Sequence, residues 1–105
     1  MTSVKFFSNL GALCGFEIKG HSSKNSDDEF GKIVCSAVSS AAYLTANTIT
    51  EIIKAKADIE VDDALMFVKV ENPSKEVQIV LSGLKLHIEQ LAEQYSKNIK
   101  IYSEV

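Results

Sequence analysis

The sequence predicts an α+β fold with two layers, in which a largely antiparallel sheet carries two helices on one face. Short segments alternate between apolar and polar residues, as strands do, and two long segments repeat apolar residues every three or four positions, as helices do. The length of 105 residues suits one core, so we expect a single domain over residues 1–105. The predicted order is β-β-α-β-β-α-β, and the order of strands within the sheet stays open.

An antiparallel hairpin is predicted at the start of the chain. Residues 2–7 alternate weakly, and residues 12–19 alternate clearly, with Cys14, Phe16 and Ile18 on one face. Turn residues at positions 9–11 separate the two segments. The second strand therefore ends just before His21.

A polar loop and a first helix follow. Residues 22–31 have no periodicity and predict a mobile loop, whereas residues 33–55 have helical spacing. The first half of this helix is rich in small residues, which allow a close approach by another backbone. The stripe that we expect it to bury consists of Val34, Val38, Ala41, Thr45, Ile49 and Ile52.

The second half of the chain is predicted to form two strands, a helix and a last strand. Strands are predicted at 57–61 and 64–71, with a turn at Asp62-Asp63 between them. Asn72-Pro73 predicts the cap and first turn of a helix over 74–96, and a last strand covers 99–102. The expected buried stripe of that helix is Val77, Leu81, Leu84, Ile88, Leu91 and Tyr95.

Composition limits the function classes. Apolar residues make up 46% and charged residues 24%, as in a folded soluble protein. A net charge of -3 with scattered lysines argues against direct binding of nucleic acid. No apolar stretch approaches the ~18 residues that span a bilayer, and the first residues lack the order of a signal peptide. We therefore expect a cytoplasmic protein without a membrane partner.

The two cysteines are expected to be free thiols, because the cytoplasm is reducing. With only two histidines and no suitable ligand spacing, neither a metal centre nor a cofactor is predicted.

One thiol and one imidazole have a context that suggests chemistry. Cys35 lies fourteen residues after His21, in the predicted first turn of the helix, where a nearby imidazole and the helix dipole would favour a thiolate. Cys14 lies within a strand and is expected in the core, and His87 is expected at the surface. A buried, inert Cys35 and a solvated His21 remain the alternatives. Residues 27–29 are acidic and form either a solvated loop or the group that orients the imidazole.

These motifs together resemble the ribosomal-processing cysteine proteases called Prp. Such proteins carry a strand ending in Gly-His, a short flexible loop, and then Ile-Val-Cys followed by small residues and a serine four places after the cysteine. The corresponding residues here are Gly20-His21, Ile33-Val34-Cys35 and Ser39. The resemblance continues through Thr45 and Asn47 to segments 82–84, 91–95 and 99–101, and so covers nearly the whole chain.

The resemblance implies a homodimeric cysteine endopeptidase that removes the N-terminal extension of a large-subunit ribosomal protein, cleaving after an aromatic residue. Cys35 would be the nucleophile and His21 the base, and we expect Gly20, Ser36 and Ser39 to contact the substrate. Family members usually have Gly-x-Asp directly before Ile-Val-Cys. Here Gly31-Lys32 leads straight into that motif, so Lys32 stands where the aspartate is usual.

The missing aspartate leaves open whether Asp27 or Asp28 assists His21. In the expected mechanism His21 accepts the thiol proton and returns it to the leaving amine, and free N–H groups of the first helix, such as those of Cys35 or Ser36, receive the oxyanion. The rival interpretation is a ribosome-assembly factor that holds the same peptide tail without cutting it. A thiol redox protein is a weaker alternative, because no second cysteine is nearby in the sequence.

Overall fold

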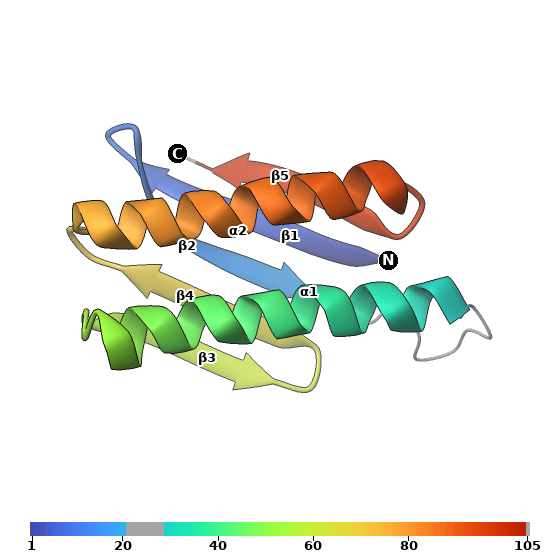
Figure 1. Cartoon of the computed structure of the whole chain (residues 1–105), viewed down its shortest axis with the longest axis horizontal. Helices are drawn as coiled ribbons and strands as arrows, with labels where there is room; N and C mark the ends of the chain where they lie inside the picture. The colour runs from blue at the N-terminus through green and yellow to red at the C-terminus, as the bar shows by residue number, and fades with distance from the viewer. Residues whose placement is uncertain (21–28, 105) are drawn as a thin grey trace.

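The computed structural model describes residues 1–20 and 29–104 and has the predicted α+β order of elements (Figure 1). Strands and helices follow one another in the expected order, and a short π-helical segment, η1, extends the first helix. The elements are β1 (Thr2–Asn9), β2 (Ala12–Lys19), α1 (Glu29–Asn47), η1 (Thr48–Ile52), β3 (Ala57–Asp62), β4 (Leu65–Val70), α2 (Lys75–Gln94) and β5 (Ile99–Glu104).

The five-stranded sheet has the order β3-β4-β2-β1-β5. Strands β1, β2, β4 and β3 pair antiparallel in succession, and β5 pairs parallel with β1, so the sheet is largely antiparallel as predicted. Figure 1 shows α1 and α2 side by side on one face of this sheet. The order places the middle strand, β2, beneath both helices, with its C-terminal end beside the start of β4.

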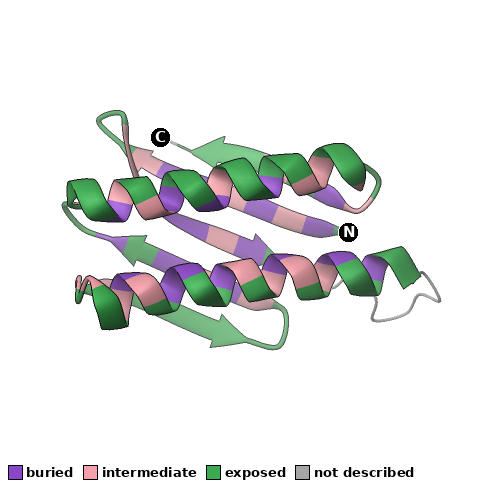
Figure 2. Cartoon of the chain, viewed as in Figure 1, coloured by how far each residue is buried: buried purple, intermediate pink, exposed green. Residues whose placement is uncertain are grey.

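The core lies between the helices and the sheet, and Figure 2 shows buried residues on the sides of both helices that face the strands. Its largest side chains, all fully buried, are Phe6, Phe16, Ile49, Leu81 and Ile88. Most of the two predicted stripes is buried or partly buried, but Ile52 is 75% exposed because the helix has changed to π-helical geometry there. The edge strand β3 is almost wholly exposed.

The helix boundaries differ from the predicted ones. Helix α1 already includes residues 29–31, which were predicted as loop, and the helical region ends after Ile52, before Lys54 with its positive φ of 63°. Helix α2 is capped by Ser74, whose hydroxyl accepts a hydrogen bond from the Val77 N–H at 3.2 Å, rather than by Asn72. Asn72 instead has a left-handed backbone, with φ of 55°. The remaining predicted loop residues, 22–28, lie outside the described residues.

The first hairpin turns as predicted. Leu10 and Gly11 both have positive φ, the geometry that matches a two-residue turn to the twist of its strands. The pairing of β1 with β2 shifts between Phe7 and Ser8, leaving Cys14 unpaired in this register. Cys14 is 3% exposed, which confirms that this thiol is buried.

The first helical region is more apolar than expected from its sequence. Residues Glu29–Ile52 are long and apolar enough to span a membrane by length and composition alone, with a mean hydropathy of 1.2. The core helix of a soluble protein meets the same criterion, and 33% of the most apolar 18-residue stretch of this segment is buried within the fold. Burial in the core therefore accounts for part of the apolar composition of this segment.

Candidate active site

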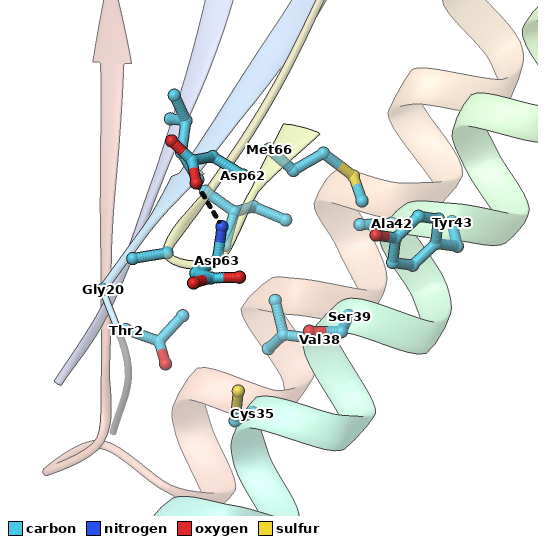
Figure 3. Close-up of a pocket in the computed structure, with 13 residues that line it drawn as sticks. Thr2, Gly20, Cys35, Val38, Ser39, Ala42, Tyr43, Asp62, Asp63 and Met66 are labelled. Atoms are coloured by element: carbon cyan, nitrogen blue, oxygen red, sulfur yellow. Dashed lines mark hydrogen bonds between the residues drawn. The ribbon is translucent and has the colours of Figure 1, made fainter. Parts of the chain in front are cut away.

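A small pocket of about 100 Å³ lies at the end of the sheet where β2 stops and β4 starts. Helix α1 forms one wall, and the end of β2, the β3–β4 turn and the first residues of β1 form the others (Figure 3). The polar or reactive residues that line it are Thr2, Cys35, Ser39, Tyr43, Asp62 and Asp63. Segments from four parts of the chain therefore line the pocket that Cys35 faces.

Cys35 is a half-buried free thiol on the face of α1 that is turned to the pocket. In Figure 3 its sulfur points from the helix into the space between Thr2 and Val38. Val38 and Ser39 follow three and four residues later and lie on the same helical face. The thiol is thus held by the rigid core while it remains accessible from the pocket.

Cys35 does not lie in the first turn of its helix, contrary to the prediction. It follows Glu29, where the described helix begins, by six residues. Only the first four N–H groups of a helix lack an internal acceptor, so the N–H groups of Cys35 and Ser36 fall within the helical hydrogen-bonding pattern. The expected supply of oxyanion donors from these two residues is therefore wrong, and the dipole effect of the helix end is weak at this position.

Gly20 joins β2 to the pocket in a conformation that favours glycine. Its φ is +91°, and a Cβ atom built on it would lie 2.7 Å from the carbonyl oxygen of Met1. Its N–H donates to the Ala64 carbonyl oxygen at 3.0 Å, which ties the end of β2 to the β3–β4 turn. The residue that follows it in the chain, His21, lies outside the described residues.

We expect Gly20→Ala to destabilise the protein, because the new Cβ would combine an unfavourable φ with a close contact to Met1. The free energy of unfolding should fall by roughly 1–3 kcal/mol, measured by urea denaturation. Gly83→Ala is the matched control, since a Cβ there meets nothing within 4 Å in the middle of α2 and should raise stability by up to about 1 kcal/mol. Equal stability of Gly20→Ala and the wild type would contradict this account of Gly20.

Two parts of the pocket were missed by sequence reasoning. Thr2 is 2% exposed, and its hydroxyl has no hydrogen-bond partner among the described residues. Asp62 and Asp63 were assigned only to a turn, where the Asp63 N–H donates to the Asp62 Oδ1 at 2.6 Å. Only the pairing of β2 with β4 brings this turn beside Cys35, and periodicity carries no information on that pairing.

The structure brings together three of the residues predicted from the sequence, Gly20, Cys35 and Ser39. Ser36 is exposed and is not among the residues that line this pocket. His21, Asp27 and Asp28 lie outside the described residues. His87 is exposed, as expected, and lines a groove between the two helices.

The thiol redox alternative gains no support from the described residues. Cys14 borders a different cavity, formed with Asn9 and Asp58, and both cysteines are free. Within residues 1–20 and 29–104, no group of three or more potential ligands comes together to hold a metal ion.

Comparison with known proteins gives a consistent family match. The family model described as cysteine protease Prp matches residues 1–100. No curated protein sequence is significantly similar to the chain. Among solved structures, the chain is similar to the essential ribosomal processing protease Prp from S. aureus in complex with a substrate peptide, with 20% identity, a TM-score of 0.88 and coverage of 98% of this chain and 99% of that chain.

Two further structures have the same fold. The same S. aureus protease with a covalently linked product peptide is 21% identical, with a TM-score of 0.85 and coverage of 98% and 99%. A protein from Streptococcus mutans is 22% identical, with a TM-score of 0.86 and coverage of 99% of this chain and 94% of that one. At these identities the structural matches establish the fold, and the family model establishes the relationship.

Proposed function

Because the chain belongs to the cysteine protease Prp family and is a cysteine-type peptidase, we propose that it removes the N-terminal extension of a large-subunit ribosomal protein, cleaving after an aromatic residue. Two similar S. aureus structures, described as those of a ribosomal processing protease, hold a substrate peptide and a covalently linked product peptide. They support a peptide as the substrate class for this chain. The ribosomal origin of the peptide and the aromatic residue are the proposed specificity.

The observation that carries the proposal is the position of the Cys35 sulfur, which faces a pocket bounded by Gly20 and Ser39. A nucleophilic thiol must be reachable by a carbonyl carbon and held still while it reacts. Cys35 meets both requirements, because α1 packs on the sheet beneath it and its side chain is only half-buried.

In the proposed mechanism the Cys35 sulfur attacks the scissile carbonyl carbon, and His21 accepts the thiol proton. The carbonyl electron pair moves to oxygen and returns when the C–N bond breaks, and His21 gives the proton to the leaving amine. The N-terminal fragment remains on Cys35 as a thioester, which water then hydrolyses. Gly20 supports this arrangement by fixing the backbone directly before His21 through its hydrogen bond to Ala64.

A cleavage assay tests the proposed substrate. The protein is incubated with the ribosomal protein carrying its extension, and the new N-terminus of the product is measured by mass spectrometry. We expect one cut directly after an aromatic residue. A matched substrate with that residue changed to alanine should be cut far more slowly, and equal cleavage of both substrates would contradict the proposed specificity.

The rival candidate, a ribosome-assembly factor that binds the tail without cutting, retains one supporting feature, Lys32 in the place of the usual aspartate. A thiol-alkylating reagent separates the two at neutral pH, because a catalytic thiolate reacts rapidly and a thiol without activation does not. Rapid labelling of Cys35 supports the protease. Slow labelling at the rate of an ordinary exposed thiol supports the binding factor.

We further propose that the protein is a homodimer that works in the cytoplasm, where its substrate is made. An apolar groove of about 640 Å³ between α1 and α2 is consistent with an interface, since Leu44 at its edge is 70% exposed. Light scattering on the purified protein measures its mass, and a monomer at micromolar concentration would contradict the dimer.

A further inference from the structure

The buried hydroxyl of Thr2 is the unexplained polar group of this pocket. Its side chain is 2% exposed, and its Oγ1 atom has no hydrogen-bond partner among the described residues. Burying a hydroxyl without a partner costs free energy, so such groups are few in folded proteins and call for a cause. The backbone of Thr2 is well anchored, because its N–H donates to the Asn98 carbonyl oxygen at 2.8 Å.

The pocket also needs a donor that the helix does not supply. Attack by the Cys35 sulfur on a carbonyl carbon creates a negative oxygen, which a cysteine protease stabilises with fixed hydrogen-bond donors. The N–H groups of Cys35 and Ser36 are engaged in hydrogen bonds within α1. An oxyanion formed at Cys35 therefore requires a donor from another element.

Two other N–H groups near the pocket already have acceptors. The Gly20 N–H donates to Ala64, and the Asp63 N–H donates to the Asp62 side chain. The Ser39 hydroxyl lies on a half-exposed residue, where water can satisfy it, whereas the Thr2 hydroxyl is shielded from water. Thr2 thus combines an unused donor with a place on the same pocket as the Cys35 sulfur (Figure 3).

We propose that the Thr2 hydroxyl is an oxyanion donor of the Cys35 site. The sulfur forms a bond to the carbonyl carbon, and the carbonyl electron pair moves to oxygen. The Thr2 hydroxyl, which is buried in the unliganded protein, turns into the pocket by rotation about the Cα–Cβ bond and donates a hydrogen bond to that oxygen without transferring its proton. The electron pair then re-forms the carbonyl as the leaving group departs, and a thioester remains on Cys35. This inference rests on the proposed function only in requiring Cys35 as the nucleophile, whatever peptide is the natural substrate.

Thr2→Val tests the proposal, because valine has nearly the same shape and lacks the donor. Two reactions of the full chain are compared at Cys35: acylation by p-nitrophenyl acetate, which passes through an oxyanion, and alkylation by iodoacetamide, which does not. Loss of one oxyanion donor should slow acylation by about 10²-fold, while alkylation keeps its wild-type rate. Thr2→Ser, which keeps the hydroxyl, should restore most of the acylation rate.

A stability measurement separates this role from a structural one. Removal of an unpartnered buried hydroxyl should leave the melting temperature of Thr2→Val unchanged or raised. Thr45→Val is the matched control, because Thr45 is also buried but its hydroxyl donates to the Ala41 carbonyl oxygen at 2.8 Å and lies outside this pocket. We expect Thr45→Val to lower the melting temperature and to leave the ratio of acylation to alkylation unchanged.

The outcomes are distinct. Unchanged acylation in a folded Thr2→Val protein overturns the proposal, and so does an equal fall in acylation and alkylation, because Thr2 would then act on the thiol rather than on the oxyanion. If the wild-type Cys35 is not acylated at all, both the nucleophile and its donor are wrong. If the ester acylates Cys35 but the ribosomal substrate is not cut, only the proposed substrate fails.

Discussion

Cys35→Ala abolishes peptide cleavage in our account, since no other described residue of the pocket offers a comparable nucleophile. The cleavage rate should fall by more than about 10⁴-fold. The fold should survive, because Cys35 is half-buried on α1 and its side chain is not part of the buried core cluster. Product formation followed by mass spectrometry and unfolding followed by circular dichroism measure the two effects separately.

Cys14→Ala is the matched control for this experiment. Cys14 is 3% exposed, so its replacement leaves a small cavity and should lower stability. Its effect on the cleavage rate of the folded protein should be small, because Cys14 borders a different cavity. If Cys35→Ala still trimmed the substrate at the wild-type rate, the assignment of the nucleophile would be wrong.

His21→Ala should lower the cleavage rate by about 10²- to 10⁴-fold, the usual contribution of a placed general base. The effect should be larger than it would be for a cysteine in a first helical turn. Cys35 lies six residues past Glu29, so the end of the helix gives its thiolate little help. In the proposed mechanism the imidazole is therefore the principal means of activation. Stopped-flow cleavage assays at neutral pH measure this change.

His87→Ala is the control for the imidazole. His87 is exposed on α2 and lines the groove between the helices, away from the Cys35 pocket. Its removal should leave both the cleavage rate and the rate of Cys35 alkylation unchanged. An equal loss of activity in His87→Ala and His21→Ala would argue against His21 as the specific base.

The fold was largely predictable because periodicity is a local signal. Alternation in residues 12–19 and helical spacing around Leu81 reflect which side of each element is buried, and both agree with the structure. The helix ends were less predictable. Glu29, Gly31 and Lys32 interrupt the apolar pattern although α1 already includes them, and Ser74 competes with Asn72 as a cap.

The site was predictable only where the chain itself carries a motif. Gly20, Cys35 and Ser39 belong to recognisable motifs, and they meet on one pocket. Thr2, Asp62 and Asp63 reach that pocket through strand pairing, which depends on contacts between distant parts of the chain. A sequence pattern marks a buried strand position at residue 2, but it does not reveal that the hydroxyl there lacks a partner.

The most direct test of the central claim, that Cys35 is the peptidase nucleophile, is rapid acid quenching of the wild-type protein during turnover, followed by mass spectrometry of the Cys35-containing fragment. We predict a covalent adduct on Cys35 whose mass matches the N-terminal part of the substrate linked as a thioester, and its loss in Cys35→Ala. Product that accumulates in the presence of Cys35→Ala, or an adduct carried by Cys14 instead, would contradict the account.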